Sequence, residues 1–335
     1  MNPSGPAPST PAHPLAEFRL ATSVDWVHVR VTFHQSTHHR HVRRRMESAG
    51  LIPGHVDHVD APHDKPARVI ATRIQDPGTP AEFMRKIQAL APHGADPIRE
   101  RDIEILGVEI ALDAKARTLK DHANLANVAA HFIHHLAHPP SENIRITPGA
   151  NLDVSRPQNL MAYRCALRDG WSVNIGNQVD PCCIRAYVKN YDSNAKDRYA
   201  ALGNWRDHSG RIEVTLSGGM CPITTVQQWR SFKFESLARH FAMVKPKGTL
   251  SPTHLNLLDW QAQLGTVKDT NGKAQNRRMG RTDTCRDTAL NQRIADALRA
   301  LTKKTKSAGI HENADPSKPV ASLGTGLKDR ASAKY

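Results

Sequence analysis

The run Ile103–Asp113 (IEILGVEIALD) alternates residue types with a period of two, the period of side chains along a β-strand. Four large apolar residues fall on one face: Leu106, Val108, Ile110 and Leu112. The opposite face carries Gly107, Glu109, Ala111 and Asp113. The pattern predicts a strand that buries one face in a core and presents two carboxylates on the other.

Three further stretches predict neighbouring strands. Val27–Phe33 alternates apolar and polar residues, and residues 171–188 form two alternating arms around a loop that contains Pro181. In the third stretch, Arg211–Ser217, the apolar residues Ile212, Val214 and Leu216 alternate with Arg211, Glu213 and Thr215. We therefore expect an α+β fold with a central, mainly antiparallel sheet.

Helices are expected on one face of this sheet. Thr79–Glu82 supplies an N-cap, a first-turn proline and an early acid. Residues 125–136 place apolar side chains at spacings of three and four before Pro139. Residues 289–302 carry a second apolar stripe, formed by Ile294, Leu298 and Leu301.

Composition divides the chain into four parts. Residues 1–17 are rich in proline and poor in apolar side chains, which predicts disorder. The main domain is expected over residues 18–245, and a small C-terminal helical appendage over residues 246–302. Residues 303–335 combine small, proline and basic residues and predict a disordered basic tail.

The charge balance favours a polyanionic partner. Lys and Arg number 46 against 32 Asp and Glu, a formal net charge of +14, which suits DNA better than a small neutral substrate. No run approaches the roughly 18 apolar residues of a membrane span, and the proline-rich start lacks an apolar signal core. Five cysteines without a CxxC pair suit a reducing compartment. We expect a soluble cytoplasmic protein without a membrane partner.

Two tyrosines are candidate nucleophiles. Tyr187 and Tyr191 share a face whether their segment is a strand or a helix. A free tyrosine has a pKa of about 10 and needs a cation or a base to react at neutral pH. Arg185 and Lys189, on the same strand face, can supply the cation, and Lys189 can protonate a leaving oxygen. The alternative is a half-buried strand tyrosine beside a solvated lysine.

Acids on the predicted strands complete the constellation. Glu109, Asp113 and Glu213 are candidate ligands for Mg²⁺ or Mn²⁺, which prefer oxygen donors. Along a straight strand Glu109 and Asp113 are separated by roughly 13 Å. We therefore expect one of these two to pair with a cation, unless a bulge near Gly107 brings them together.

The order of these runs resembles the rolling-circle replication initiators of the Rep-trans type, which occur on plasmids and filamentous phages. The residues that carry the resemblance are Val24-Asp25-Trp26, Val108–Asp113, Ile175-Gly176-Asn177, Ile184–Asp192 and Arg211-Ile212-Glu213. The resemblance covers about residues 20–240. It implies a nicking and closing enzyme whose tyrosine attacks a DNA phosphate at the replication origin, keeps the 5′ end covalently and releases a 3′-hydroxyl primer.

The resemblance also implies roles for single residues. Tyr187 lies in the Arg-x-Tyr-x-Lys context of the family nucleophile, with Tyr191 in reserve. The metal ligands would be Glu109, Asp113 and Glu213, and the phosphate contacts Arg185, Lys189 and Arg211. A host helicase and a second copy of the chain are the partners it implies. Arg43, Arg44 and Arg45 are either further DNA contacts or a solvated helix face.

Other interpretations stay open. A repressor or origin binder would use the basic charge without cutting DNA. A two-histidine (HUH) nickase would suit the tyrosine spacing, although His39-Arg40-His41 and His55–His58 break its His-apolar-His pattern. A tyrosine recombinase would place its tyrosine near the C-terminus, and Tyr335 lies in the tail. The histidines of residues 131–138 have metal-site spacing, but a solvated helix face is the favoured interpretation.

Overall fold

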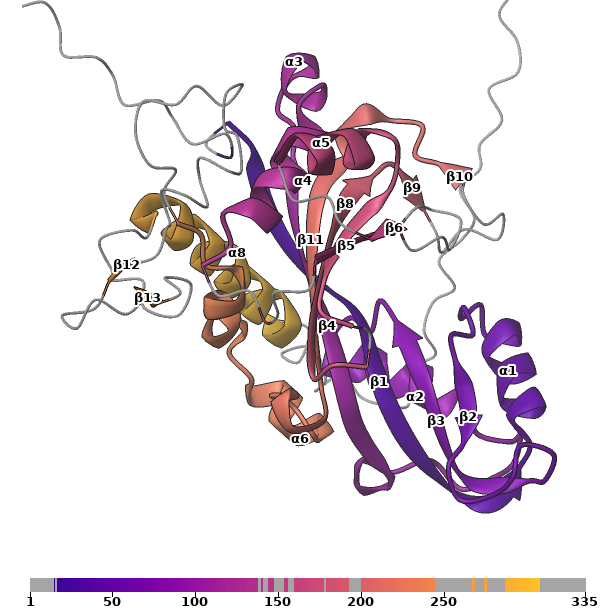
Figure 1. Ribbon diagram of the computed structural model, residues 1–335. Helices are drawn as coiled ribbons and strands as arrows, with labels where there is room; N and C mark the ends of the chain where they lie inside the picture. The colour runs from indigo at the N-terminus through magenta and orange to yellow at the C-terminus, as the bar shows by residue number, and fades with distance from the viewer. Residues whose placement is uncertain are drawn as a thin grey trace, which may run out of the picture.

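The computed structural model describes residues 15, 17–137, 140, 144–147, 154–155, 160–177, 179–192, 200–244, 267–268, 274–275 and 287–307. A nine-stranded antiparallel sheet forms its centre, in the order β2-β3-β1-β4-β11-β8-β7-β5-β6 (Figure 1). Its strands are β1 (Arg19–Thr37), β2 (Val56–His58), β3 (Ala67–Gln75), β4 (Ile103–Lys115), β5 (Ile144–Thr147), β6 (Val154–Ser155), β7 (Ser172–Ile175), β8 (Cys182–Lys189) and β11 (Ser209–Ser217). The predicted α+β class and antiparallel sheet are confirmed.

Two small strand pairs and several helices complete the described structure. The pairs are β9 (Tyr191–Asp192) with β10 (Ala200–Ala201), and β12 (Val267–Lys268) with β13 (Ala274–Gln275). The α-helices are α1 (His39–Ser48), α2 (Pro80–Gln88), α3 (Leu119–His122), α4 (Leu125–His134), α5 (Leu160–Arg168), α6 (Val226–Ser231) and α8 (Thr288–Ser307). Short 3-10 segments are η1 (Glu100–Asp102), η2 (Trp205–Asp207), η3 (Gly218–Met220) and η4 (Phe234–Phe241). Among the described residues, no helix combines the length and apolar character that crossing a bilayer requires.

Apolar alternation builds one core between the sheet and the helices. Ile212 and Val214 of β11 are buried in it together with Phe132 of α4 and Ile87 of α2. Gly210 permits the close approach of α4, because a Cβ there would lie 3.0 Å from the carbonyl oxygen of Leu125. The polar residues of β4, β8 and β11 therefore point to the opposite side of the sheet.

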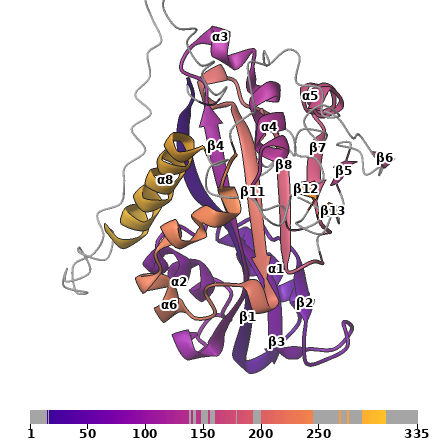
Figure 2. The same cartoon turned by 60° about the vertical axis from the view of Figure 1, so that its left-hand side comes forward.

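The last described helix belongs to this core. Helix α8 packs along β1 and against η4 (Figure 2), and its buried residues are Leu290, Ile294, Leu298 and Leu301. Thr22 of β1 donates a hydrogen bond of 2.8 Å to the carbonyl of Ala297. The helix continues to Ser307, past the expected end at residue 302. Its apolar stripe is thus buried in the same core as the sheet, where the sequence predicted a helical appendage. The apolar residues near Leu255 lie outside the described residues.

A β-bulge interrupts the first strand beside β4. Val24 pairs with Ile110 and Trp26 with Glu109, so that Asp25 is an extra residue between two pairs. Trp26 and Val27 are both buried, which breaks the strict alternation of the sequence. Bulges redirect side chains, and this one directs Asp25 toward the polar face of the sheet.

The histidines of α4 correct one expectation. His131 and His135 are buried instead of solvated, with stacked rings and Nδ1 atoms 2.9 Å apart. Helix α5 packs against α4, and the backbone near Met243 bonds to the chain that follows α4. This second layer covers the side of α4 that the sequence suggested would face water.

Candidate active site

Three carboxylates from three strands meet on the polar face of the sheet. Asp25 of β1, Glu109 of β4 and Glu213 of β11 each offer an oxygen within 4.8 Å of the other two, and we call them the carboxylate cluster. Glu109 and Glu213 are buried, while the side chain of Asp25 is 20% exposed. Three hard oxygen donors at this spacing suit Mg²⁺ or Mn²⁺.

Glu109 is the incompletely satisfied member of the cluster. Its Oε2 accepts a hydrogen bond of 2.6 Å from the hydroxyl of Thr215. Its Oε1 is buried and has no hydrogen-bond partner within the described part of the chain. Burial, followed by the negative charge of Glu213, raises the pKa of Glu109 to about 8. A buried oxygen without a donor is costly, and a cation would satisfy it, so the donor set fits a divalent ion.

Asp113, the third acid of the predicted ligand set, lies outside the cluster because Arg211 holds it. Arg211 Nε and Nη2 donate to Asp113 Oδ1 and Oδ2, each at 2.8 Å, and Ser209 adds a bond to Oδ1. Burial opposes its ionisation, but the Arg211 guanidinium and these bonds keep the pKa of Asp113 below its usual value. The two residues are cross-strand partners, which explains why Asp113 pairs with a cation.

Arg211 also joins Asp113 to the cluster. Its Nη1 lies 3.0 Å from Asp25 Oδ1 and 3.4 Å from Glu213 Oε1. The guanidinium is buried, and its bonds are directed at carboxylates. This placement makes Arg211 a positioning residue for the acids, in place of the direct phosphate contact expected from the sequence.

The site carries an excess of negative charge. Asp25, Glu109, Asp113 and Glu213 contribute four carboxylates, and Arg211 and Arg185 contribute two guanidiniums. When these six groups are all ionised, two negative charges remain among them, and a divalent cation would offset this excess together with the nearby charge of Lys189. Burying unbalanced charge is expensive, and this cost is the reason that the pKa values of Asp25 and Glu109 are raised.

Tyr187 bonds directly to the cluster. Its hydroxyl donates to Glu213 Oε1 at 2.6 Å, while Arg185 Nε and Nη2 donate to Glu213 Oε2 at 2.8 and 2.6 Å. The pairing of β8 with β11 places Arg185 opposite Glu213 and Tyr187 opposite Arg211. The Arg185 guanidinium also lies 5.1 Å from the centre of the Tyr187 ring. Phenol, cation and carboxylate therefore share one small region.

Electrostatics hold this phenol in its protonated form. Burial and then the charge of Glu213 raise the pKa of Tyr187 above its ordinary value, and the two arginines oppose this only partly. Glu213 is the group placed to accept the phenol proton. Added positive charge on the cluster would offset the charge of Glu213, so the phenolate becomes more accessible when a cation is bound.

The remaining candidates on β8 and β9 lie close by in sequence. Lys189, half-buried, is opposite Ser209, and its charge acts on both Asp25 and Asp113. Tyr191 begins β9, but its side chain lies outside the described part of the structure. The Arg185 side chain, 43% exposed, and Asp25 mark the side from which a phosphate can approach.

The basic residues of α1 divide into two kinds. Arg43 and Arg44 are exposed on the helix. Arg45 is partly buried, and its guanidinium donates to the carbonyl of Leu90 at 2.7 Å and to the hydroxyl of Thr37 at 3.1 Å. Arg43 and Arg44 are placed to meet a polyanion, whereas Arg45 anchors α1 to the rest of the domain.

Histidines gather far from Tyr187. His39 and His58 come together with His38 near the start of α1 and the end of β2. In the sheet, β2 is five positions from β8, about 24 Å at the usual strand spacing. A two-histidine nickase needs its histidines beside the nucleophile, so this arrangement does not support that alternative.

The sequence interpretation did not include Asp25 among the ligands. Extending the alternation of Val27, Val29 and Val31 backwards puts residue 25 on the buried face, where an acid is unexpected. The adjacent apolar pair Trp26-Val27 is the signal of the bulge that turns Asp25 to the other side.

Comparisons with known proteins give a likeness only among solved structures. No protein-family model and no curated protein matches the sequence. Among solved structures, the chain is similar to the rolling circle replication initiator protein from Geobacillus stearothermophilus, at 11% identity and a TM-score of 0.31. The match covers 73% of this chain and 96% of that chain. A likeness of this degree carries no argument about activity, which has to come from the chemistry of the site.

Proposed function

We propose that this protein is a DNA-nicking and strand-joining enzyme that starts rolling-circle replication through a covalent 5′-phosphotyrosine. The observation that carries the proposal is the 2.6 Å hydrogen bond from the Tyr187 hydroxyl to Glu213, within a cluster of three carboxylates. The residue order shared with Rep-trans initiators supports the same reaction. The formal charge of +14 suits a DNA partner.

In the proposed reaction Tyr187 Oη attacks the phosphorus of one phosphodiester. The phenol proton passes to Glu213, a bond forms between Oη and phosphorus, and the bond from phosphorus to the 3′ oxygen breaks. Lys189 donates a proton to that leaving oxygen, which becomes the 3′ hydroxyl primer. Rejoining runs through the same steps in reverse, with the 3′ hydroxyl as the nucleophile.

Asp25, Glu109 and Glu213 would hold a divalent ion, Mg²⁺ or Mn²⁺. When bound, such an ion supplies positive charge that offsets the negative charge of the scissile phosphate. Arg185 is placed to position Glu213 and to contact the phosphate from its exposed side. Arg43 and Arg44 would contact DNA farther from the site, and a host helicase and a second copy of the chain would act after nicking.

The test is covalent capture. Purified protein, single-stranded origin DNA and Mn²⁺ should yield an adduct that survives SDS. A repressor or origin binder would show only affinity that falls steeply with salt. One observation favours this second candidate: burial and the charge of Glu213 raise the pKa of Tyr187, which makes the phenol a poorer nucleophile. Failure to form an adduct with any origin strand would also favour it.

Glu213→Gln should abolish metal-dependent cleavage and leave DNA affinity within about twofold. The amide keeps the shape of the side chain but cannot take the phenol proton, and we expect a loss of at least about 100-fold in rate. Glu104→Gln, in an exposed ion pair with Arg30, is the matched control and should behave like the unmodified protein. If Glu213→Gln loses DNA binding and cleavage equally while Glu104→Gln keeps both, Glu213 has a folding role instead.

Binding of Mn²⁺ should depend on pH through Glu109. Because its pKa is raised to about 8, Glu109 is protonated at neutral pH, and an ion has to displace that proton. We expect affinity at pH 6.5 to be about tenfold or more below that at pH 8.5, since competition weakens binding up to tenfold per pH unit below the pKa. Titration calorimetry in two buffers of different ionisation enthalpy measures the released proton. Glu109→Gln should flatten the profile, and a flat profile in the unmodified protein contradicts the assignment.

A further inference from the structure

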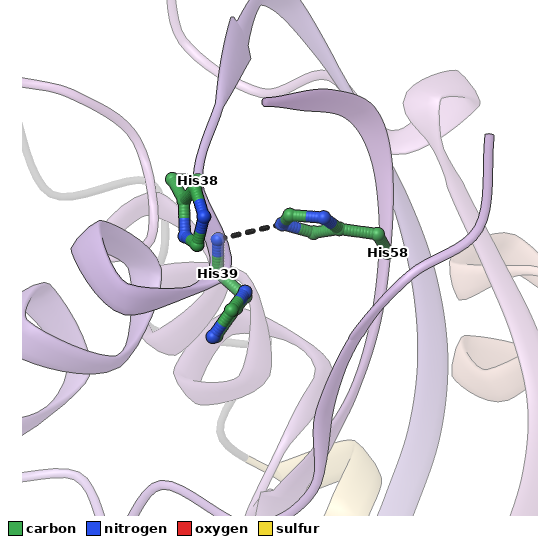
Figure 3. Close-up of side chains that lie close together, drawn as sticks. All are labelled: His38, His39 and His58. Carbon is green, nitrogen blue, oxygen red and sulfur yellow. Dashed lines mark hydrogen bonds between the residues drawn. The ribbon is translucent and has the colours of Figure 1, made fainter. Parts of the chain in front are cut away.

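A second group of ligand atoms lies at the edge of the sheet, remote from the carboxylate cluster. His38 lies between β1 and α1, His39 is the first residue of α1, and His58 ends β2. Each offers a ring nitrogen, and the three atoms lie within 4.8 Å of one another. Figure 3 shows the ring of His58 facing the backbone nitrogen of His39, with His38 beside it. His63, in the loop after β2, adds a fourth ring whose centre is 3.9 Å from that of His39.

The His58 imidazole is already oriented as a ligand. Its Nδ1 lies 3.1 Å from the carbonyl oxygen of Pro62, to which an Nδ1 proton would donate. That bond leaves Nε2 as a lone-pair donor, and Nε2 accepts the backbone N–H of His39 at 2.8 Å. A ligand histidine usually donates its other ring N–H to a carbonyl or carboxylate, which fixes the tautomer.

His39 supplies an unsatisfied nitrogen. Its Nδ1 is buried and has no hydrogen-bond partner among the residues that the structure describes. Its ring centre is 4.3 Å from that of His38 and 4.9 Å from that of His58. A packing role for four imidazoles does not explain a buried nitrogen without a partner, whereas a metal ion in their midst does.

We propose that His38, His39 and His58 bind one transition-metal ion of the zinc class, with His63 or water in the fourth position. Imidazole nitrogens select Zn²⁺, Co²⁺, Ni²⁺ or Cu²⁺ over Mg²⁺ and Mn²⁺. At bonds of about 2.0 Å, tetrahedral ligand atoms are separated by roughly 3.4 Å. The ring nitrogens, which lie within 4.8 Å of one another, would therefore approach by at most about 1.4 Å on binding. The ion replaces the His39 N–H as partner of His58 Nε2, and that N–H, in the first turn of α1, turns to solvent.

The ion would fasten α1 to the sheet edge. His38 is the N-cap of α1, and His58 belongs to β2. In the described structure the hydrogen bond between His39 and His58 joins these two elements. A bound ion would put several metal–ligand bonds in its place, and would fix the direction of the helix that carries Arg43 and Arg44.

The experiment measures metal binding by the untagged full chain after treatment with a chelator. With excess Mg²⁺ present to occupy the carboxylate cluster, Zn²⁺ is titrated against a colorimetric competitor, and Co²⁺ is titrated by visible absorption. We expect one equivalent of Zn²⁺ per chain and intense tetrahedral Co²⁺ bands. His58→Gln and His39→Ala should each weaken binding by about 100-fold or more, because loss of even a supporting partner costs 10–100-fold.

One further ligand variant and two controls test whether these histidines, and no other groups of the chain, hold the ion. His38→Asn keeps an N-cap acceptor but removes a ligand, so it should also lose the tight site without loss of helix content. His93→Ala removes an exposed histidine elsewhere and should bind like the unmodified chain. Glu109→Gln should leave Zn²⁺ binding unchanged. Absence of a tight equivalent in the unmodified chain, or its retention in His58→Gln, overturns the proposal.

Discussion

Tyr187→Phe is expected to eliminate the covalent adduct with DNA, with a fall in strand cleavage of more than about 10³-fold, as for loss of other catalytic nucleophiles. The substitution removes the oxygen that would bond to phosphorus and keeps the ring that stacks beside Arg185. Glu213 loses one hydrogen bond but keeps those from Arg185. Adduct formation on radiolabelled single-stranded origin DNA, followed by denaturing electrophoresis, measures the effect.

Tyr191→Phe is the matched control for this experiment. It changes the same group four residues away, and we expect the adduct to persist. DNA affinity of Tyr187→Phe should stay within about twofold, since the hydroxyl faces Glu213 and not the exposed side. Should Tyr191→Phe be the variant that loses the adduct, the nucleophile is Tyr191.

Arg211→Met should lower the free energy of unfolding by about 3–5 kcal/mol, the usual cost of removing one partner from a buried ion pair. Arg211 is buried, and it bonds to both oxygens of Asp113 and to Asp25. Without it, Asp113 becomes a buried charge that keeps the hydrogen bond from Ser209 but has lost its ion pair. Urea denaturation at pH 7 gives the difference.

Two further variants test whether the unpaired charge of Asp113 causes this loss of stability. Arg30→Ala breaks an exposed ion pair with Glu104 and should cost at most about 1 kcal/mol. Adding Asp113→Asn to Arg211→Met removes the stranded charge and should recover part of the loss. The contrary outcome is a double variant whose loss of stability equals the sum of the losses in Arg211→Met and Asp113→Asn alone. That result would show that the pair contributes through packing and not through charge.

The strands of the core were predictable because apolar residues line one face of each and polar residues the other. Alternation in residues 103–113 and 211–217 indicated β4 and β11, and the faces of Ile212 and Glu213 follow from it. The capping box at Thr79 likewise marked the start of α2. Such local rules work where a residue's environment is set by its own strand or helix.

The ligand set of the site could not be derived in this way. Which acids meet depends on the register of three strands, and the register placed Arg211 opposite Asp113 and Thr215 opposite Glu109. Asp25 belongs to the carboxylate cluster only because a β-bulge turns its side chain to the polar face of the sheet. Buried histidines on α4 depended on α5, a helix more than twenty residues later. Contacts between distant segments decided the register and the burial of these histidines, and only the bulge has a local signal, the adjacent apolar pair Trp26-Val27.

The contact of α8 with β1 has a consequence for biosynthesis. Arg293 donates to the carbonyl oxygens of Leu15 and Phe18, and Leu298 lies in the core that β1 helps to form. The opening strand emerges from the ribosome long before its covering helix exists, so its apolar face stays uncovered through most of translation. Prematurely terminated chains would expose this face, and only a nascent protein translated through α8 can complete the core that covers it.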